Sequence, residues 1–209
     1  DPTLEPSAPL MRIERDDLLK LEWALTREWL ETDGRGGYAA STVLACNRRR
    51  YHGLLVGPPP GSTRRHVWLS RFEETLHGER KTFALSLARY PGLWSPHGHQ
   101  AIHAFELAPY PVFVYRIGDA EVRREVLMAR SLPGVLVRYS IRGAPHAVEL
   151  RLRPLLAFRE ADALTFENVA LVAGRARIAG GGTGVKIELE PVGVVRAERT
   201  APVDDYWGE

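Results

Sequence analysis

The stretches VELRLR (residues 148–153) and VKIELE (residues 185–190) decide the fold class of this chain. In both stretches every second residue is apolar and the residues between are charged. Successive side chains of a β-strand point to opposite faces of a sheet, so this alternation predicts strands with one buried and one solvated face. Half-buried strands of this kind are typical of antiparallel sheets.

Turn-forming residues divide the second half of the chain, from about Val112 onward, into segments of hairpin length. Glycine adopts backbone angles that other residues avoid, and proline fixes one angle of a turn in advance. Two glycine-rich or proline-rich runs, at residues 57–62 and 180–184, are predicted to be surface turns. The strand-dividing turns that we expect are Gly118-Asp119, Pro133-Gly134 and Gly143-Ala144-Pro145.

Helical spacing is weak and confined to the first part of the chain. Leu18, Leu21 and Leu25 recur at helical intervals, which favours one short helix, but no clear stop signal follows. We therefore predict an all-β fold, a large antiparallel β-sandwich with at most one or two short helices.

Length and composition fit a single domain. The chain has 209 residues, of which 44% are hydrophobic, and β-sandwiches of this size are commonly one unit with one core. We expect residues 1–209 to form one domain, with about the first ten residues disordered. The chain begins with Asp1 and ends soon after Tyr206 and Trp207, so we expect it to be part of a longer protein.

Charge and cysteine content limit the possible partners and the cellular compartment. The formal net charge is only +2 with 26% charged residues, so the totals do not indicate a nucleic-acid-binding protein. The single cysteine, Cys46, excludes an internal disulfide and fits a reducing compartment, so we expect the cytoplasm. No apolar run approaches the roughly 18 residues of a membrane helix, so we expect no membrane partner. The glycine-rich run at 180–184 lacks the Gly-Lys-Ser/Thr ending of a phosphate-binding loop, and we expect no cofactor.

Catalytic groups are not evident. A glycosidase needs two carboxyl groups on either side of one bond, whereas the acid pairs of this chain are sequence neighbours that would point to opposite faces of a strand. We interpret them as solvated surface acids. Ser41, Ser70 and Cys46 have no identifiable context for a nucleophile. The acid pairs are Asp16-Asp17, Glu73-Glu74 and Asp204-Asp205.

A run of histidines raises the question of a metal. His97 and His99 would share one face of a strand, as metal ligands often do, with His103 nearby. No fourth ligand is evident, and Pro96 and Gly98 indicate a turn, so a polar loop is favoured and no metal site is predicted.

Two clusters combine arginine with aromatic residues. Arg48-Arg49-Arg50 precedes Tyr51 and His52, and Arg64-Arg65-His66 precedes Trp68. Such clusters can bind nucleic acid through phosphates and stacked bases, but both adjoin apolar strand residues in a nearly neutral chain. Ion-paired strand ends, or a contact with sugar or with another domain, are the favoured interpretations.

Sugars suit the segment between residues 28 and 56 for a physical reason. The apolar faces of a pyranose stack on aromatic rings, and its hydroxyls match polar side chains. The alternative for Trp29 and Tyr38 is that they are core residues beside a glycine-rich bend. The candidate contacts with carbohydrate or with a partner domain are Trp29, Asp33, Tyr38, Asn47, Arg49, Tyr51 and His52.

Residues 28–39 (EWLETDGRGGYA) and 47–56 (NRRRYHGLLV) carry a family resemblance. They resemble the N-terminal domain of prokaryotic-type glycogen debranching enzymes, the amylo-α-1,6-glucosidase family. A second block at 67–74 looks like the family's Leu-Ser and paired-glutamate strand. A third, at 153–159 with 164–165 and 167–168, looks like its later Arg-Pro strand. The resemblance thus covers about residues 28–168.

The resemblance implies a division of labour. In such enzymes this region is a large antiparallel sandwich, of the supersandwich kind, that packs on a separate α/α-barrel. The barrel carries the carboxylates that hydrolyse α-1,6 branch linkages, and we expect it to lie outside this chain. The implied partners are the C-terminal catalytic domain and an α-glucan, glycogen or maltooligosaccharide. Whether 4-α-glucanotransferase activity accompanies hydrolysis stays open, as does a purely structural domain without a ligand. A nucleic-acid-binding module ranks last.

Three positions depart from the family's pattern. Asp33 stands where asparagine is usual and keeps a hydrogen-bond acceptor. Arg48 replaces a threonine. Ala161-Asp162 stands where an aromatic residue and a histidine are common, which puts a ligand contact near 161 in doubt.

Overall fold

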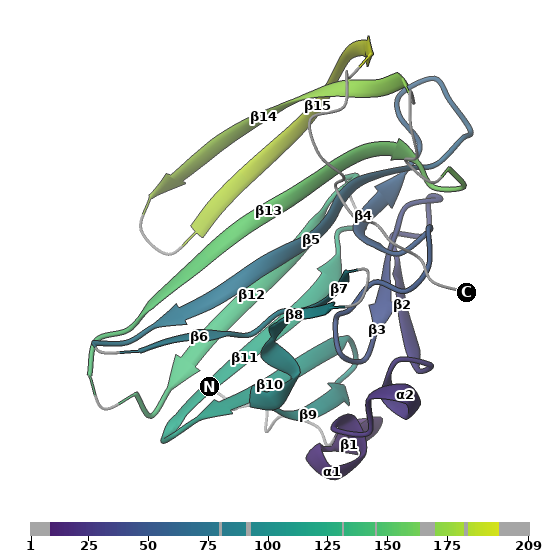
Figure 1. Ribbon diagram of the computed structural model, residues 1–209. Coiled ribbons are helices and arrows are strands. Elements are labelled where there is room, and N and C mark those ends of the chain that lie inside the picture. Colours follow the sequence, from purple (N-terminus) through teal and green to yellow (C-terminus); the bar gives the residue numbers. More distant parts are fainter. Residues whose placement is uncertain are drawn as a thin grey trace, which may run out of the picture.

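The protein is built almost entirely from antiparallel strands (Figure 1). The computed structural model describes residues 9–79, 81–90, 93–130, 132–144, 146–163, 170–181 and 184–196, with side chains up to residue 163. The all-β prediction is confirmed. The third resemblance block falls partly outside this range, because residues 164–168 are not among those described.

The first sheet has five strands in the order β1-β9-β10-β11-β12. Every neighbouring pair that the structure describes in it is antiparallel. Gly118, in the tight turn between β10 and β11, has a φ of 58°, as predicted for a turn glycine. The strands are β1 (Met11–Glu14), β9 (Ile102–Leu107), β10 (Pro111–Ile117), β11 (Ala120–Met128) and β12 (Val135–Arg142).

The second sheet runs β13-β5-β4-β3-β2, with β6 paired to β5. Its long members β5 and β13 pair over almost their whole length. The strands are β2 (Glu28–Thr32), β3 (Tyr38–Thr42), β4 (Gly53–Gly57), β5 (His66–His77), β6 (Thr82–Ala84) and β13 (Glu149–Glu160).

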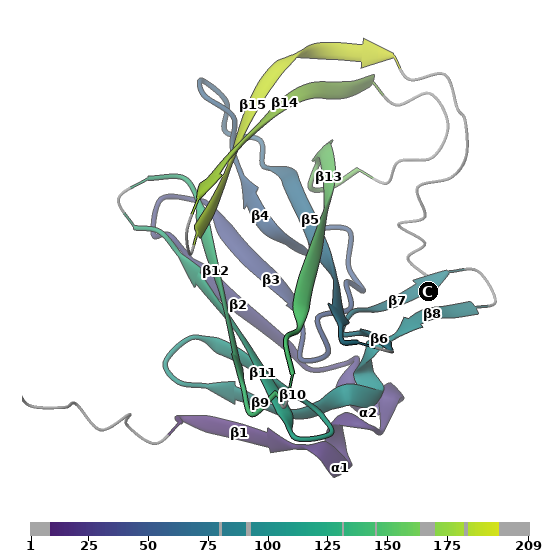
Figure 2. The ribbon, with the colours of Figure 1, turned by 90° about the vertical axis from the view of Figure 1, so that its left-hand side faces the viewer.

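Two hairpins stand apart from these sheets. The pair β7 (Leu87–Tyr90) and β8 (Leu93–His97) projects to one side of the body in Figure 2. The pair β14 (Ala170–Gly181) and β15 (Gly184–Arg196) lies at one end of the molecule, beyond β13. The predicted strand at 185–190 thus falls within β15.

Short helices connect strands at two places among the described residues, between β1 and β2 and between β8 and β9. Two α-helices, α1 (Arg15–Leu18) and α2 (Leu21–Ala24), replace the one predicted from the leucine spacing. They are separate because Lys20 has a ψ of 81°, which no helix can continue through. A 3-10 turn, η1 (Gly98–Ala101), joins β8 to β9.

The main core lies between the two sheets. Trp29 on β2 meets the ring of Phe113 on β10 edge-on at 6.1 Å, and Phe113 meets Phe105 on β9 at 5.1 Å. Edge-to-face pairs of this kind add to the stabilisation that burial alone provides. The sheets are therefore joined by aromatic contacts as well as by the aliphatic core around them.

A smaller apolar cluster lies on the opposite face of the second sheet. Val56, Val67 and Ala161 are buried there, with Tyr38 packed against them. Ala39 belongs to the main core, and neighbours along a strand face opposite ways, so Tyr38 points away from that core. This outer face is where the candidate site lies.

The predicted alternation at 148–153 is found at the start of β13. Glu149, Arg151 and Arg153 are exposed, and Leu150 packs against the core. Leu152 departs from the pattern because it is 41% exposed. It pairs with Glu74 on β5, and β13 is the last strand of this sheet in the part of the chain that the structure describes.

The interpretation of Glu74 as a solvated acid is wrong. Glu73 and Glu74 do face opposite ways on β5, but Glu74 is only 1% exposed and faces the core. Its carboxylate accepts hydrogen bonds from Ser86 Oγ at 2.6 Å and Tyr139 Oη at 2.9 Å. A buried carboxylate is tolerated only when it is bonded in this way.

Candidate functional site

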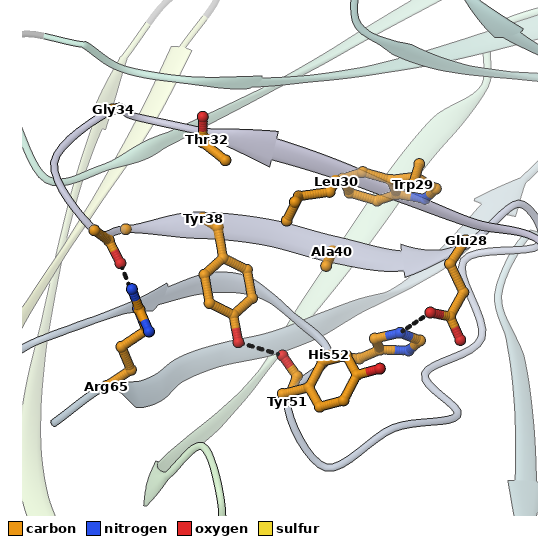
Figure 3. A pocket seen from close by; sticks show the side chains of 12 residues that line it. Glu28, Trp29, Leu30, Thr32, Gly34, Tyr38, Ala40, Tyr51, His52 and Arg65 are labelled. Carbon is orange, nitrogen blue, oxygen red and sulfur yellow. Dashed lines mark hydrogen bonds and ion pairs between the residues drawn. The ribbon is translucent and has the colours of Figure 1, made fainter.

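Two neighbouring pockets lie on this face, and the larger of them is a hollow of about 650 Å³ on the outer face of β2 and β3 (Figure 3). Leu30 and Ala40 are paired across these strands and form its base. The loop that leads into β4 forms one wall, and the glycine-rich β2–β3 turn forms the opposite end. The lining residues are Glu28, Trp29, Leu30, Thr32, Gly34, Gly36, Gly37, Tyr38, Ala40, Tyr51, His52 and Arg65.

A charged group stands at one end of the pocket. Glu28 Oε1 accepts a hydrogen bond from Arg49 Nε at 2.9 Å, and Glu28 Oε2 lies 3.6 Å from His52 Nε2. The Glu28 side chain is 29% exposed, so its carboxylate is partly open to the pocket. Arg49 thus positions one carboxylate oxygen, and the other lies beside His52.

His52 is fully buried behind Glu28. Its Nδ1 accepts the Arg48 backbone N–H at 3.0 Å, so the proton of the neutral ring is on Nε2, which faces Glu28. Burial lowers the pKa of His52 to about 4; Glu28 acts in the opposite direction, and Arg49 adds to the lowering. The ring is therefore neutral at physiological pH, with its Nε2 proton on the side of Glu28.

Two tyrosines form the adjoining wall. The Tyr38 hydroxyl donates a hydrogen bond of 2.9 Å to the Tyr51 carbonyl, and Figure 3 shows the two side chains beside each other. Tyr51 is 41% exposed and meets the His52 ring edge-on at 5.4 Å. Leu30, on the base, is 61% exposed. The pocket thus presents aromatic and aliphatic surface next to a carboxylate.

The glycine-rich turn closes the far end. Asp33 Oδ1 accepts the backbone N–H groups of Arg35 at 2.7 Å and Gly37 at 2.9 Å. Gly34 and Gly36 have φ values of 72° and 98°, which only glycine adopts easily. Arg65 Nε then donates to the Gly36 carbonyl at 2.8 Å, which ties the arginine to the turn.

Four of the seven predicted contact residues line this pocket: Trp29, Tyr38, Tyr51 and His52. Arg49 stands beside it through its bond to Glu28. Trp29 is only 5% exposed, donates its Nε1–H to the Thr42 carbonyl at 3.0 Å and meets Phe113, so its ring belongs to the main core.

The other two predicted residues do not line it. Asp33 bonds to the turn backbone instead of facing the hollow. Asn47 accepts the Ser41 hydroxyl at 2.7 Å and donates to the Ser70 carbonyl at 3.1 Å, which links β3 to β5. Both anchor the segment that carries the pocket.

Sequence reasoning missed Glu28, Leu30 and Arg65 as lining residues. A signal existed for the first two, because residues 28 and 30 must share the face opposite Trp29 on a strand. Arg65 was recognised only as part of a basic cluster. Its place beside the β2–β3 turn depends on the pairing of β4 with β5.

A second pocket of about 370 Å³ adjoins the first. Tyr38, Tyr51 and Arg65 line both. Its other walls include Ala161 and Asp162, which depart from the family's pattern. They lie beside Tyr38 and Tyr51, which belong to the segments that resemble the family. The remaining lining residues are Thr63, Arg64 and Glu160.

The described residues contain neither a metal-binding cluster nor a membrane-spanning helix. In the part of the chain that the structure describes, no three His, Cys, Asp or Glu side chains could together hold a metal. His97, His99 and His103 are divided among β8, η1 and β9. No helix of the described segments is long and apolar enough to cross a bilayer.

Comparison with known proteins identifies the family. No curated protein and no solved structure matches the chain. The family model described as "Glycogen debranching enzyme N terminal" matches residues 27–195, which is most of the chain and includes both pockets. The chain therefore belongs to the family of glycogen debranching enzyme N-terminal domains.

Proposed function

We propose that this chain is the non-catalytic N-terminal domain of a cytoplasmic debranching enzyme and that its larger pocket binds α-glucan. The observation that supports binding is the combination of an exposed Tyr51 ring and Leu30 with the carboxylate of Glu28. A glucosyl ring has apolar C–H faces and a rim of hydroxyls, so it needs stacking surface and fixed polar groups side by side.

The chemistry of branch hydrolysis belongs to another part of the enzyme in this proposal. Hydrolysis of a glycosidic bond needs two carboxyl groups about 5–9.5 Å apart. Glu28 is the one carboxylate among the residues that line the larger pocket, and it is already bonded to Arg49. The domain would hold glucan and support the catalytic α/α-barrel of the same protein, which would act on α-1,6 linkages.

Calorimetric titration with maltooligosaccharides at millimolar concentration tests glucan binding. We expect saturable binding that Tyr51→Ala weakens by about 3–10-fold, the value of one aromatic contact. Phe83→Ala is the matched control, since Phe83 is an exposed ring on β6 outside both pockets. Heat and tryptophan fluorescence that stay unchanged on adding sugar would contradict binding.

A second candidate function is a structural one, in which the same face contacts the catalytic domain without sugar. The observation that favours it is the exposure of Leu30, which is 61% accessible on the pocket base. In the intact enzyme, Tyr51→Ala and Leu30→Ser would then weaken domain association while glucan affinity stays unchanged. The opposite result, lost glucan affinity with intact association, supports glucan binding.

A further inference from the structure

The second pocket extends the first, and we infer that it is a further glucosyl subsite, so that both form one groove for a linear α-glucan. This inference rests on the proposed glucan binding and goes further by assigning a ligand to the second pocket. Both hollows fall within the range of about 300–1,000 Å³ that small-ligand sites occupy. Tyr38, Tyr51 and Arg65 line both of them, so the two pockets adjoin.

The residues shared by the two pockets are held in place. The Tyr38 hydroxyl is bonded to the Tyr51 carbonyl, and Arg65 Nε is bonded to the Gly36 carbonyl. Tyr38 also packs on the outer cluster of Val56 and Val67. Fixed side chains lose little conformational entropy when a ligand arrives, so this junction is suited to hold a chain that crosses it.

The charges of the second pocket favour a neutral ligand. Arg64, Arg65, Glu160 and Asp162 line it, so its cations and carboxylates are equal in number. Arg64 Nη1 is already 3.2 Å from Glu160 Oε1. A phosphate would meet two carboxylates, and a cation would meet two guanidinium groups. A neutral polyol, in contrast, can donate to Asp162 and accept from Arg65.

The second pocket also has an apolar element. Ala161 is buried and packs with Val56 and Val67, while Thr63 adds a hydroxyl to the wall. The turn that carries Ala161 is held by its backbone N–H, which donates to the Arg65 carbonyl at 2.9 Å. The pocket therefore offers a small apolar patch, a hydroxyl and a carboxylate, which suits a single sugar ring.

The test is the dependence of affinity on glucan length. The 209-residue chain is titrated with maltose, maltotriose, maltopentaose and maltoheptaose, as wild type and as Asp162→Ala. We expect the wild-type affinity to rise with length as the second pocket fills. Asp162→Ala should reduce affinity for the longer sugars by about tenfold, the value of one charged hydrogen bond, and leave maltose within twofold.

Asp16→Ala is the matched control, because Asp16 is an exposed acid on α1 outside both pockets. Melting curves verify that each variant is folded. If wild type binds all lengths equally, or Asp162→Ala weakens all lengths equally or none, the second subsite is refuted while glucan binding stands. If wild type binds no sugar, both proposals are refuted.

Discussion

Arg124 on β11 and Glu74 on β5 form an ion pair between the two sheets, with Nη1 and Oε1 3.1 Å apart. Their side chains are 3% and 1% exposed. Tyr139 and Ser86 complete the hydrogen bonds of the carboxylate, and the Arg124 guanidinium lies 5.1 Å from the Phe113 ring centroid. The core of the sandwich therefore contains a charged centre whose members depend on one another.

Removing one member of this pair should be far more harmful than removing both. We expect Glu74→Leu to lower the free energy of unfolding by about 3–5 kcal/mol, because Arg124 would remain charged and buried without its partner. The double variant Glu74→Leu/Arg124→Met should recover much of that loss, since neither charge is then desolvated. Urea unfolding measures both changes.

Glu149→Ala is the control for the ion-pair experiment. Glu149 pairs with Arg151 on the surface, where both side chains are about 60% exposed, so its loss should leave the unfolding midpoint almost unchanged. Equal effects of Glu74→Leu and Glu149→Ala would contradict the importance of the buried pair.

The Asp33 position should accept asparagine but not alanine. Both backbone N–H groups in the turn bond to one oxygen, Oδ1, and asparagine has an oxygen at the same place. We expect Asp33→Asn to stay within about 0.5 kcal/mol of wild type and Asp33→Ala to lose about 1–3 kcal/mol, because the buried N–H of Gly37 and the partly buried N–H of Arg35 lose their acceptor. Thermal unfolding in parallel with urea measures this, and similar losses for both variants would show that the charge itself matters.

The thiol of Cys46 should be inert in the folded protein. Burial raises its pKa to about 11, and only 1% of the residue is exposed. A thiol reagent at pH 7.5 should therefore react at a rate set by opening of the fold, and fully within seconds in denaturant. Fast stoichiometric reaction of the native protein would mean that the loop before β4 opens readily.

The strand pattern was predictable because it depends on neighbours in sequence. The charged residues between 149 and 153 needed only the alternation of a strand to be placed at the surface. Burial of Glu74 had no such local signal. Its partners Arg124 and Tyr139 are 50 and 65 residues away, and only the packing of β11 and β12 against β5 brings them together.

The candidate site likewise has one part that local sequence predicts and another that depends on the packing of distant strands. The segment from Glu28 to His52 was recognised from its own residues, and it does supply most of the larger pocket. The second pocket joins Tyr38 and Tyr51 to Asp162, more than 100 residues further along. The pairing of β13 with β5 creates that contact. This pairing has a register shift near Arg159, which no sequence pattern predicts.

The final prediction concerns His52 and pH. Its pKa in the folded state is about 4, below the ordinary value of 6.5, because burial opposes the charged form. The unfolded state therefore binds a proton first as pH falls, and stability is lost between pH 6.5 and 4 with a slope that approaches about 1.4 kcal/mol per pH unit.

His52→Asn, which does not titrate, should lack this part of the slope. Its stability deficit at pH 7 should therefore shrink by pH 4.5 in urea unfolding. His146→Asn, at an exposed histidine, should follow wild type throughout. Parallel curves for wild type and His52→Asn would show that His52 is protonated in the folded protein, with Glu28 beside it outweighing the cost of burial.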